Sequence, residues 1–127
     1  MKNLMIVDDE ADVALAFKLS LTNGGYLVDV YTDPEEAVSR FSPRKYDLVL
    51  LDIRMPKMNG FEVYRELKKV DRDTNICFLT AFDIYESEFS KLFPELDVRY
   101  FLKKPISTKE LKEKIEQMTT GQSVRAK

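Results

Sequence analysis

The chain has 127 residues, of which 44% are hydrophobic and 33% are charged, and its formal net charge is −2. This length fits one globular domain, and the apolar content together with a single cysteine excludes disordered and disulfide-stabilised classes. Lysine and arginine form no block, so the charge pattern of a nucleic-acid binder is missing. We therefore expect a single domain that does not itself bind nucleic acid.

The chain contains no histidine, and its one cysteine, Cys77, lies in an apolar stretch. The lack of histidine excludes imidazole metal ligands and nucleophiles paired with histidine. No apolar segment approaches the length of a membrane span, and no signal-peptide core follows Met1. We expect no membrane association and a cytoplasmic location.

The first half of the chain alternates short apolar runs with amphipathic segments. Residues 4–7 and 27–31 predict strands because their apolar residues are mostly consecutive. A helix is predicted from about Glu10 to the glycines that follow Asn23, and a second begins with Asp33 as its N-cap and Pro34 at its first position. The apolar face of the first helix contains Val13, Ala14, Phe17 and Leu21.

The second half repeats the alternation. Residues 48–51, 76–79 and 98–102 predict three further strands. Helices are predicted after Asn59-Gly60, at about residues 84–93, and from the capping box Ser107 to Glu110. The apolar faces of the first and last of these helices contain Val63, Tyr64, Leu67, Leu111, Ile115 and Met118.

Five strands that alternate with five helices predict a doubly wound α/β fold with a parallel sheet and right-handed crossovers. The expected arrangement is flavodoxin-like, (βα)5, with strand order 2-1-3-4-5. In such a sheet ligands bind beyond the carboxyl ends of the strands, where the order reverses between strands 1 and 3.

Chemically active side chains follow four of the predicted strands. Asp8 and Asp9 follow the first strand, Asp52 the third, Thr80 the fourth and Lys104 the fifth. Carboxylates brought this close repel one another, so a cation is expected among them. Oxygen ligands without histidine or cysteine select a hard ion, which indicates Mg²⁺ with Mn²⁺ as a substitute.

This set matches the requirements of phosphoryl transfer, which are positioning and positive charge. Asp52 is the predicted nucleophile, and Asp9 and Asp52 are the predicted metal ligands, with Asp8 acting on the metal through water. Lys104 supplies a second positive charge, and the hydroxyl of Thr80 donates a hydrogen bond.

Two other functions use the same fold class. An FMN-binding flavodoxin requires a phosphate loop rich in glycine and hydroxyl groups after the first strand, whereas this chain has three acids there. A phosphohydrolase of the haloacid dehalogenase type requires a second acid two residues after its aspartate to protonate the leaving group. That position is Arg54 in this chain, which disfavours turnover of an external substrate.

The stretch from Leu51 to Gly60, LDIRMPKMNG, resembles the phosphorylation-site sequence of the receiver domains of two-component response regulators. The segments IVDDE at residues 6–10, LTA at 79–81 and KKPI at 103–106 resemble the other three motifs of that family in order. The resemblance covers residues 2–119. We expect a receiver domain at residues 1–119, followed at 120–127 by a polar tail or the start of a linker.

The resemblance implies that Asp52 accepts a phosphoryl group from a histidine kinase, a phosphotransfer protein or a small phosphodonor. It also implies that the backbone carbonyl of Arg54 binds the metal. In this family phosphorylation draws the threonine inward, and an aromatic residue rotates and reshapes the face made by helix 4, strand 5 and helix 5. These switch residues correspond to Thr80 and Phe101 in this sequence.

Phe82 occupies a position, two residues after Thr80, that often carries a polar residue in this family. We expect Phe82 and the Arg54 side chain to shield the acyl phosphate and to lengthen its lifetime. The resemblance further implies a downstream protein or an effector domain beyond residue 127, and dimerisation on phosphorylation. A receiver that binds partners without being phosphorylated remains an alternative.

Overall fold

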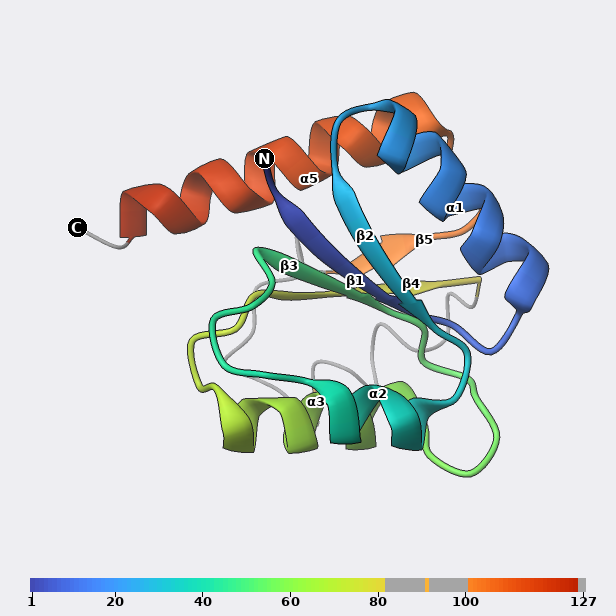
Figure 1. Ribbon diagram of the computed structural model, residues 1–127. Coiled ribbons are helices and arrows are strands. Elements are labelled where there is room, and N and C mark those ends of the chain that lie inside the picture. The colour runs from blue at the N-terminus through green and yellow to red at the C-terminus, as the bar shows by residue number, and fades with distance from the viewer. Residues whose placement is uncertain (82–90, 92–100, 126–127) are drawn as a thin grey trace.

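The computed structural model describes the backbone of residues 1–81, 91 and 101–125, and the side chains of the same ranges up to residue 120. Five parallel strands form one sheet in the order β2-β1-β3-β4-β5 (Figure 1). This order confirms the predicted flavodoxin-like arrangement. The strands are β1 (Asn3–Val7), β2 (Leu27–Tyr31), β3 (Leu48–Leu51), β4 (Ile76–Thr80) and β5 (Phe101–Lys103).

Most strand predictions hold to within one residue. β2 and β3 have the predicted bounds, whereas β1 and β4 are each one residue longer. The predicted fifth strand began at residue 98, and residues 98–100 lie outside the described residues, as does nearly all of the helix predicted at 84–93. β2 lies at the edge of the sheet, and its Leu27 and Asp29 are exposed, so it is not buried on both faces as the central strands β1, β3 and β4 are.

The described helices are α1 (Ala11–Asn23), α2 (Pro34–Arg40), α3 (Gly60–Val70) and α5 (Thr108–Arg125). Their ends follow the predicted sequence signals. The Asp33 side chain accepts a hydrogen bond from the Glu35 N–H at the start of α2, and Asn59 and Glu62 form a capping box at the start of α3. Gly25 has a φ of 97°, which permits the chain to turn after α1.

Helix α5 differs from the prediction because its backbone continues to Arg125, within the segment expected to be a polar tail. Thr119 ties the part of α5 just before this extension to the chain that precedes β1. It is buried, its hydroxyl donates to the Ile115 carbonyl at 2.8 Å, and it accepts from the Lys2 ammonium at 2.6 Å. Lys2 also pairs with Glu116 at 2.9 Å, and the Tyr26 hydroxyl donates to the same carboxylate. We call Lys2, Tyr26, Glu116 and Thr119 the α5 anchor.

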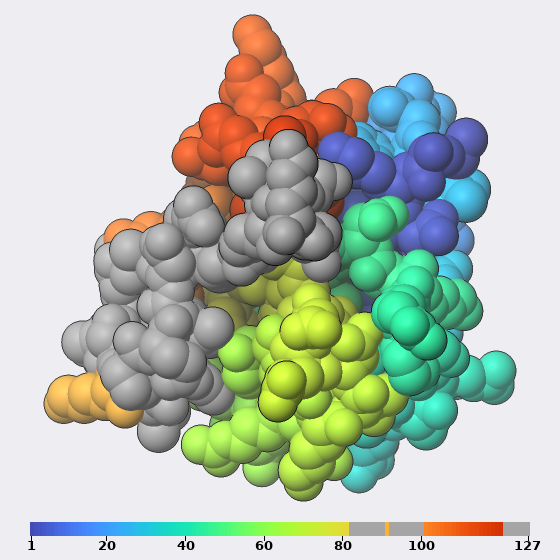
Figure 2. Space-filling model, turned by 90° about the vertical axis from the view of Figure 1, so that its left-hand side faces the viewer, coloured from blue at the N-terminus to red at the C-terminus, as the bar shows by residue number. Residues whose placement is uncertain are grey.

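One apolar cluster covers each face of the sheet. In β1, Met5 and Val7 point to the cluster under α2 and α3, whereas Leu4 and Ile6 point to the cluster under α1 and α5. The two pairs of helices lie on opposite faces (Figure 1), and α5 and α3 are also seen on opposite sides of the molecule in Figure 2. Burial of each Leu, Ile or Phe side chain stabilises the folded state by about 1.5–3 kcal/mol. The two clusters together therefore hold the sheet between the two pairs of helices.

The helices of the described residues include none with the length and apolar character needed to cross a bilayer.

Candidate functional site

The register between β1 and β3 places two acids side by side at the carboxyl edge of the sheet. Ile6 pairs with Leu50, so the next residues of the same face are Asp8 and Asp52. The Asp52 N–H donates to the Val7 carbonyl at 2.9 Å, which continues the ladder one residue past the strands. Both acids are buried, with exposed fractions of 3% for Asp8 and 7% for Asp52.

Lys104 brings the positive charge predicted for this edge. Its ammonium lies 2.6 Å from Asp8 Oδ2, and both side chains are largely buried. The Lys104 N–H donates to the Thr80 carbonyl at 2.7 Å, so the end of β4 holds the lysine in place. The peptide bond between Lys104 and Pro105 is cis. The structure therefore assembles Asp8, Asp52, Thr80 and Lys104 at one edge from four strand ends.

Asp52 is electrostatically unfavourable as a carboxylate in this environment. Its pKa is raised from 3.8 to about 7, chiefly because burial outweighs the opposing charge of Lys104; the charges of Asp8 and Asp9 also act to raise this pKa, and the Ile53 N–H acts to lower it. The Ile53 N–H donates to Asp52 Oδ1 at 2.9 Å. Positive charge added near Asp52 would restore its ionised form.

Thr80 is fully buried, and its hydroxyl is one of two buried side-chain atoms in the described part of the chain that have no hydrogen-bond partner. A buried hydroxyl without a partner costs free energy, so an incoming oxygen acceptor would be stabilised there. Phe101 is partly buried and packs near Phe78, with ring centroids 6.3 Å apart. Phe78 and Thr80 both belong to β4, two residues apart. Phe78 therefore links the two predicted switch residues, because it contacts Phe101 and lies on the same strand as Thr80.

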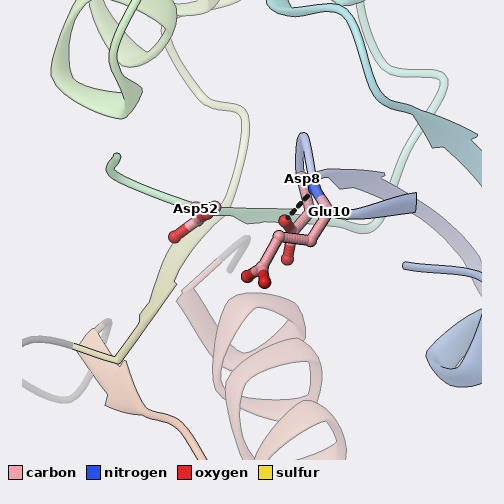
Figure 3. Close-up of side chains that lie close together, drawn as sticks. All are labelled: Asp8, Glu10 and Asp52. Atoms are coloured by element: carbon pink, nitrogen blue, oxygen red, sulfur yellow. Dashed lines mark hydrogen bonds between the residues drawn. The ribbon is translucent and has the colours of Figure 1, made fainter. Parts of the chain in front are cut away.

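The acids that converge most closely are Asp8, Glu10 and Asp52, one carboxylate oxygen of each lying within 4.8 Å of the others. We call these three residues the acid group. Asp8 and Glu10 extend from the loop after β1, and Asp52 extends from the end of β3 (Figure 3). Asp9 is half-buried and is not a member, although its charge reaches Asp52. An all-oxygen donor set with this much negative charge fits Mg²⁺ or Mn²⁺.

The sequence prediction did not include Glu10. Its place directly before α1 suggested the start of a helix, and it is indeed the N-cap residue, without a capping bond from its side chain. The signal that identifies it is the unbroken run of three acids after β1. Of the other predicted site residues, Arg54 is exposed, and Phe82 lies outside the described residues.

Gly60 allows α3 to begin against the backbone of the Asp52 loop. A Cβ at this position would lie 2.4 Å from the Asp52 carbonyl oxygen and 2.8 Å from the Ile53 Cα. The Gly60 N–H donates to the Ile53 carbonyl at 2.8 Å. This close approach explains why glycine ends the sequence stretch that began at Leu51.

Comparisons with known proteins agree with this geometry. The family model described as the response regulator receiver domain matches residues 4–116. A probable transcriptional regulator ycf27 from Guillardia theta is 38% identical over 114 residues, which cover 90% of this chain and 44% of the relative. The alkaline phosphatase synthesis transcriptional regulatory protein PhoP of Bacillus subtilis is 33% identical over 91% of this chain and 47% of its own length. The chain thus spans about half the length of these relatives.

Solved structures give the same result. The response regulator protein TrrA from Thermotoga maritima, solved in complex with Mg²⁺-BeF, is 35% identical, has a TM-score of 0.78, and matches 93% of this chain and 99% of its own. A CheY-like receiver domain protein from Methanospirillum hungatei is 24% identical with a TM-score of 0.83 over 98% of both chains, which supports the fold alone.

Proposed function

This chain belongs to the family of response regulator receiver domains, and on that premise we propose that it accepts a phosphoryl group on Asp52 in a Mg²⁺-dependent reaction. The observation that carries the proposal is the buried pair of carboxylates, Asp8 and Asp52, with the Lys104 ammonium at the carboxyl edge of the sheet. A buried carboxylate that is costly to ionise and lies beside a fixed cation is suited to react with an electrophilic phosphorus.

In the proposed step an Asp52 carboxylate oxygen forms a bond to phosphorus while the bond from phosphorus to the donor's leaving atom breaks. Since the Ile53 N–H occupies Oδ1, we assign Oδ2 as the nucleophile. The donor, a phosphohistidine of a partner or a small acyl phosphate, leaves with the electron pair of the broken bond. The product is an acyl phosphate on Asp52.

The proposed metal ligands are the carboxylates of Asp9 and Asp52 and the backbone carbonyl of Arg54, with Asp8 acting through water. Bound Mg²⁺ supplies positive charge that favours the ionised form of Asp52 and balances the phosphoryl oxygens. Lys104 exchanges its partner in this scheme. It leaves Asp8 Oδ2, which it contacts at 2.6 Å, and binds a phosphoryl oxygen.

The proposed switch uses the unpartnered Thr80 hydroxyl. Donation from this hydroxyl to a phosphoryl oxygen satisfies a buried group and draws the end of β4 toward Asp52. Phe101 pairs with Phe78 in the register between β4 and β5, so a shift at Thr80 changes the space available to Phe101. The face made by the segment before β5, β5 and α5 then carries the signal to a downstream protein.

The proposed partners are a sensor histidine kinase or phosphotransfer protein, and a downstream protein or effector domain. Relatives such as PhoP are named as transcriptional regulatory proteins, and this chain matches about half of their length. We propose that the domain works in the cytoplasm, does not bind DNA itself, forms a dimer on phosphorylation and turns over no external substrate. Arg54 stands where a phosphohydrolase of the haloacid dehalogenase type needs an acid, which argues against that alternative.

The decisive experiment is intact-mass measurement after incubation with acetyl phosphate and Mg²⁺. The wild type is expected to gain one phosphoryl group, and Asp52→Asn none. Asp33→Asn is the matched control because Asp33 also follows a strand, β2, and asparagine caps a helix as well as aspartate does. A wild type that stays unmodified, or an Asp52→Asn variant that still gains the mass, would show that the proposal is wrong.

The lifetime of the acyl phosphate tests the proposed role of Phe82 and Arg54. If these side chains shield the phosphoryl group from water, Phe82→Glu loses the phosphate faster than the wild type does. An unchanged or slower loss rejects the role of Phe82 and leaves the role of Asp52 intact.

A further inference from the structure

Four aromatic rings form a continuous group on the face of the sheet that α3 covers. Phe78 of β4 lies at its centre and is fully buried. The ring centroid of Phe78 lies 5.3 Å from that of Phe61 and 5.7 Å from that of Tyr64, both on α3. The Phe101 centroid on β5 lies 6.3 Å away. All three separations fall in the range at which aromatic rings attract one another. We call these four residues the aromatic group.

The strand register explains why Phe78 is the central ring. Phe78 pairs with Phe101 on the neighbouring strand, and it shares one face of β4 with Thr80 because side chains alternate along a strand. Phe61 and Tyr64 are three residues apart on α3, so they lie on the same side of that helix. Phe78 is therefore enclosed by two rings from the helix layer, while the partly buried Phe101 lies beside it on β5.

The first turn of α3 is fixed to the loop that contains Asp52. The Gly60 N–H donates to the Ile53 carbonyl at 2.8 Å, and a Cβ at Gly60 would meet the Asp52 carbonyl oxygen. Phe61 follows Gly60 directly, so its ring cannot leave Phe78 unless this turn of the helix moves. Protein interiors are close-packed, and a ring enclosed in this way cannot readily give space to a neighbour.

We propose that α3 takes part in the switch, because its two rings hold Phe78 against Phe101 and so oppose the rotation of Phe101 in the unmodified protein. The inference rests on the proposed function, in which phosphorylation of Asp52 releases that rotation, and it adds a helix outside the face made by β5 and α5. A smaller side chain at position 78 lets Phe101 rotate without a phosphoryl group. A protein that has already rotated binds a phosphoryl mimic more tightly, because binding no longer has to drive the change.

The test is calorimetric titration of the whole chain with beryllofluoride, a mimic of the bound phosphoryl group, at saturating Mg²⁺. Phe78→Leu is expected to bind the mimic about 5-fold more tightly than the wild type does, at the low end for coupled sites. A cavity that only loosened the core would weaken binding or leave it unchanged. Phe41→Leu is the matched control, because Phe41 is buried in the same apolar cluster but stacks on Tyr46. The control should keep wild-type affinity.

Two further variants test the parts assigned to α3 and to Phe101. Tyr64→Leu removes one of the two α3 rings and should also tighten binding, by a smaller factor; it supplies the measurement if Phe78→Leu does not fold. In a Phe101→Leu background no ring is restrained, so Phe78→Leu should leave the affinity unchanged. Unchanged or weaker binding in either folded variant, or tighter binding that persists in the Phe101→Leu background, overturns the inference. Circular dichroism confirms that each variant is folded before titration.

Failure of this inference differs from failure of the proposed function. If the wild type gains one phosphoryl group on Asp52 by mass but Phe78→Leu binds beryllofluoride no more tightly, only the role of α3 is wrong. If the wild type neither gains the phosphoryl group nor binds beryllofluoride, the proposed function is wrong and this inference falls with it.

Discussion

Each end of strand β1 carries a cluster of ionisable side chains, and the two clusters have opposite balances of charge and hydrogen bonding. At the amino end, Lys2 of the α5 anchor binds Glu116 and Thr119, and the Tyr26 hydroxyl donates to Glu116. The pKa of Glu116 is lowered, first by the bond from Tyr26 and then by the bond from Lys2. These partners stabilise the charged form.

At the carboxyl end the balance is reversed. The pKa of Asp52 is raised because burial outweighs the attraction of Lys104, and the hydroxyl of Thr80 has no hydrogen-bond partner among the residues that the structure describes. One end of the strand thus holds α5 on the sheet, while the other carries unfavourable interactions that, on the proposed function, a cation and a phosphoryl group would relieve. Polar groups that find all their partners within the chain stabilise the fold, whereas similar groups left without such partners are suited to bind a ligand.

Replacement of one acid at each end of β1 should change the free energy of unfolding in opposite directions. The larger change is expected for Asp52 in the acid group. In the absence of divalent cations, Asp52→Asn is expected to raise the free energy of unfolding by up to about 4 kcal/mol above neutral pH, because a buried carboxylate is removed. Glu116→Gln should lower it by roughly 1 kcal/mol, since this ion pair is partly exposed. Urea unfolding with a chelator measures both values, and two changes of the same sign would contradict the comparison.

The same difference predicts the pH dependence of the metal-free protein. The pKa of Asp52 is about 7 in the folded state, against an ordinary value of 3.8, so the folded state binds more protons between these values. Stability from this group is therefore lost as pH rises through about 7. Urea unfolding at a series of pH values should show this loss in the wild type and not in Asp52→Asn. Added Mg²⁺ should reduce it.

Substitution of one glycine near each end of the sheet tests how tightly the backbone is packed there. Gly60→Ala is expected to cost about 3 kcal/mol because the new Cβ meets the backbone of Asp52 and Ile53. Gly25→Ala should cost only about 1 kcal/mol, since it has a φ of 97° and open space around it. Thermal unfolding compares the two. Gly60→Ala should also slow phosphorylation, and equal rates in both variants would show that the approach of α3 does not position Asp52.

The smallest expected effects come from a pair of threonines. Thr119→Val removes the hydroxyl that binds Lys2 and the Ile115 carbonyl, and should destabilise the fold by about 1 kcal/mol. Thr80→Val removes a hydroxyl without a partner, so the unmodified protein should be equally stable or slightly more stable. Phosphorylation should then stabilise Thr80→Val less than the wild type. A large loss of stability in unmodified Thr80→Val would show that the Thr80 hydroxyl does make a stabilising hydrogen bond before phosphorylation.

The sequence by itself determined the layout of the fold and the edge that carries the chemistry. Runs of consecutive apolar residues located the strands, and their alternation with helices predicted the order 2-1-3-4-5. That order requires Asp8, Asp52, Thr80 and Lys104 to lie at one edge, because parallel strands have their carboxyl ends together. These conclusions depend only on local periodicity and on the handedness of crossovers.

Only the tertiary structure decided which side chains are partners. Lys104 binds Asp8, 96 positions away, and Tyr26 binds Glu116, 90 positions away. The run of three acids after β1 did not show which of them converge with Asp52, and no sequence pattern showed that the Thr80 hydroxyl lacks a partner among the described residues. These contacts depend on how segments far apart in the chain are buried and packed together. The local sequence pattern does not specify which of those distant side chains meet.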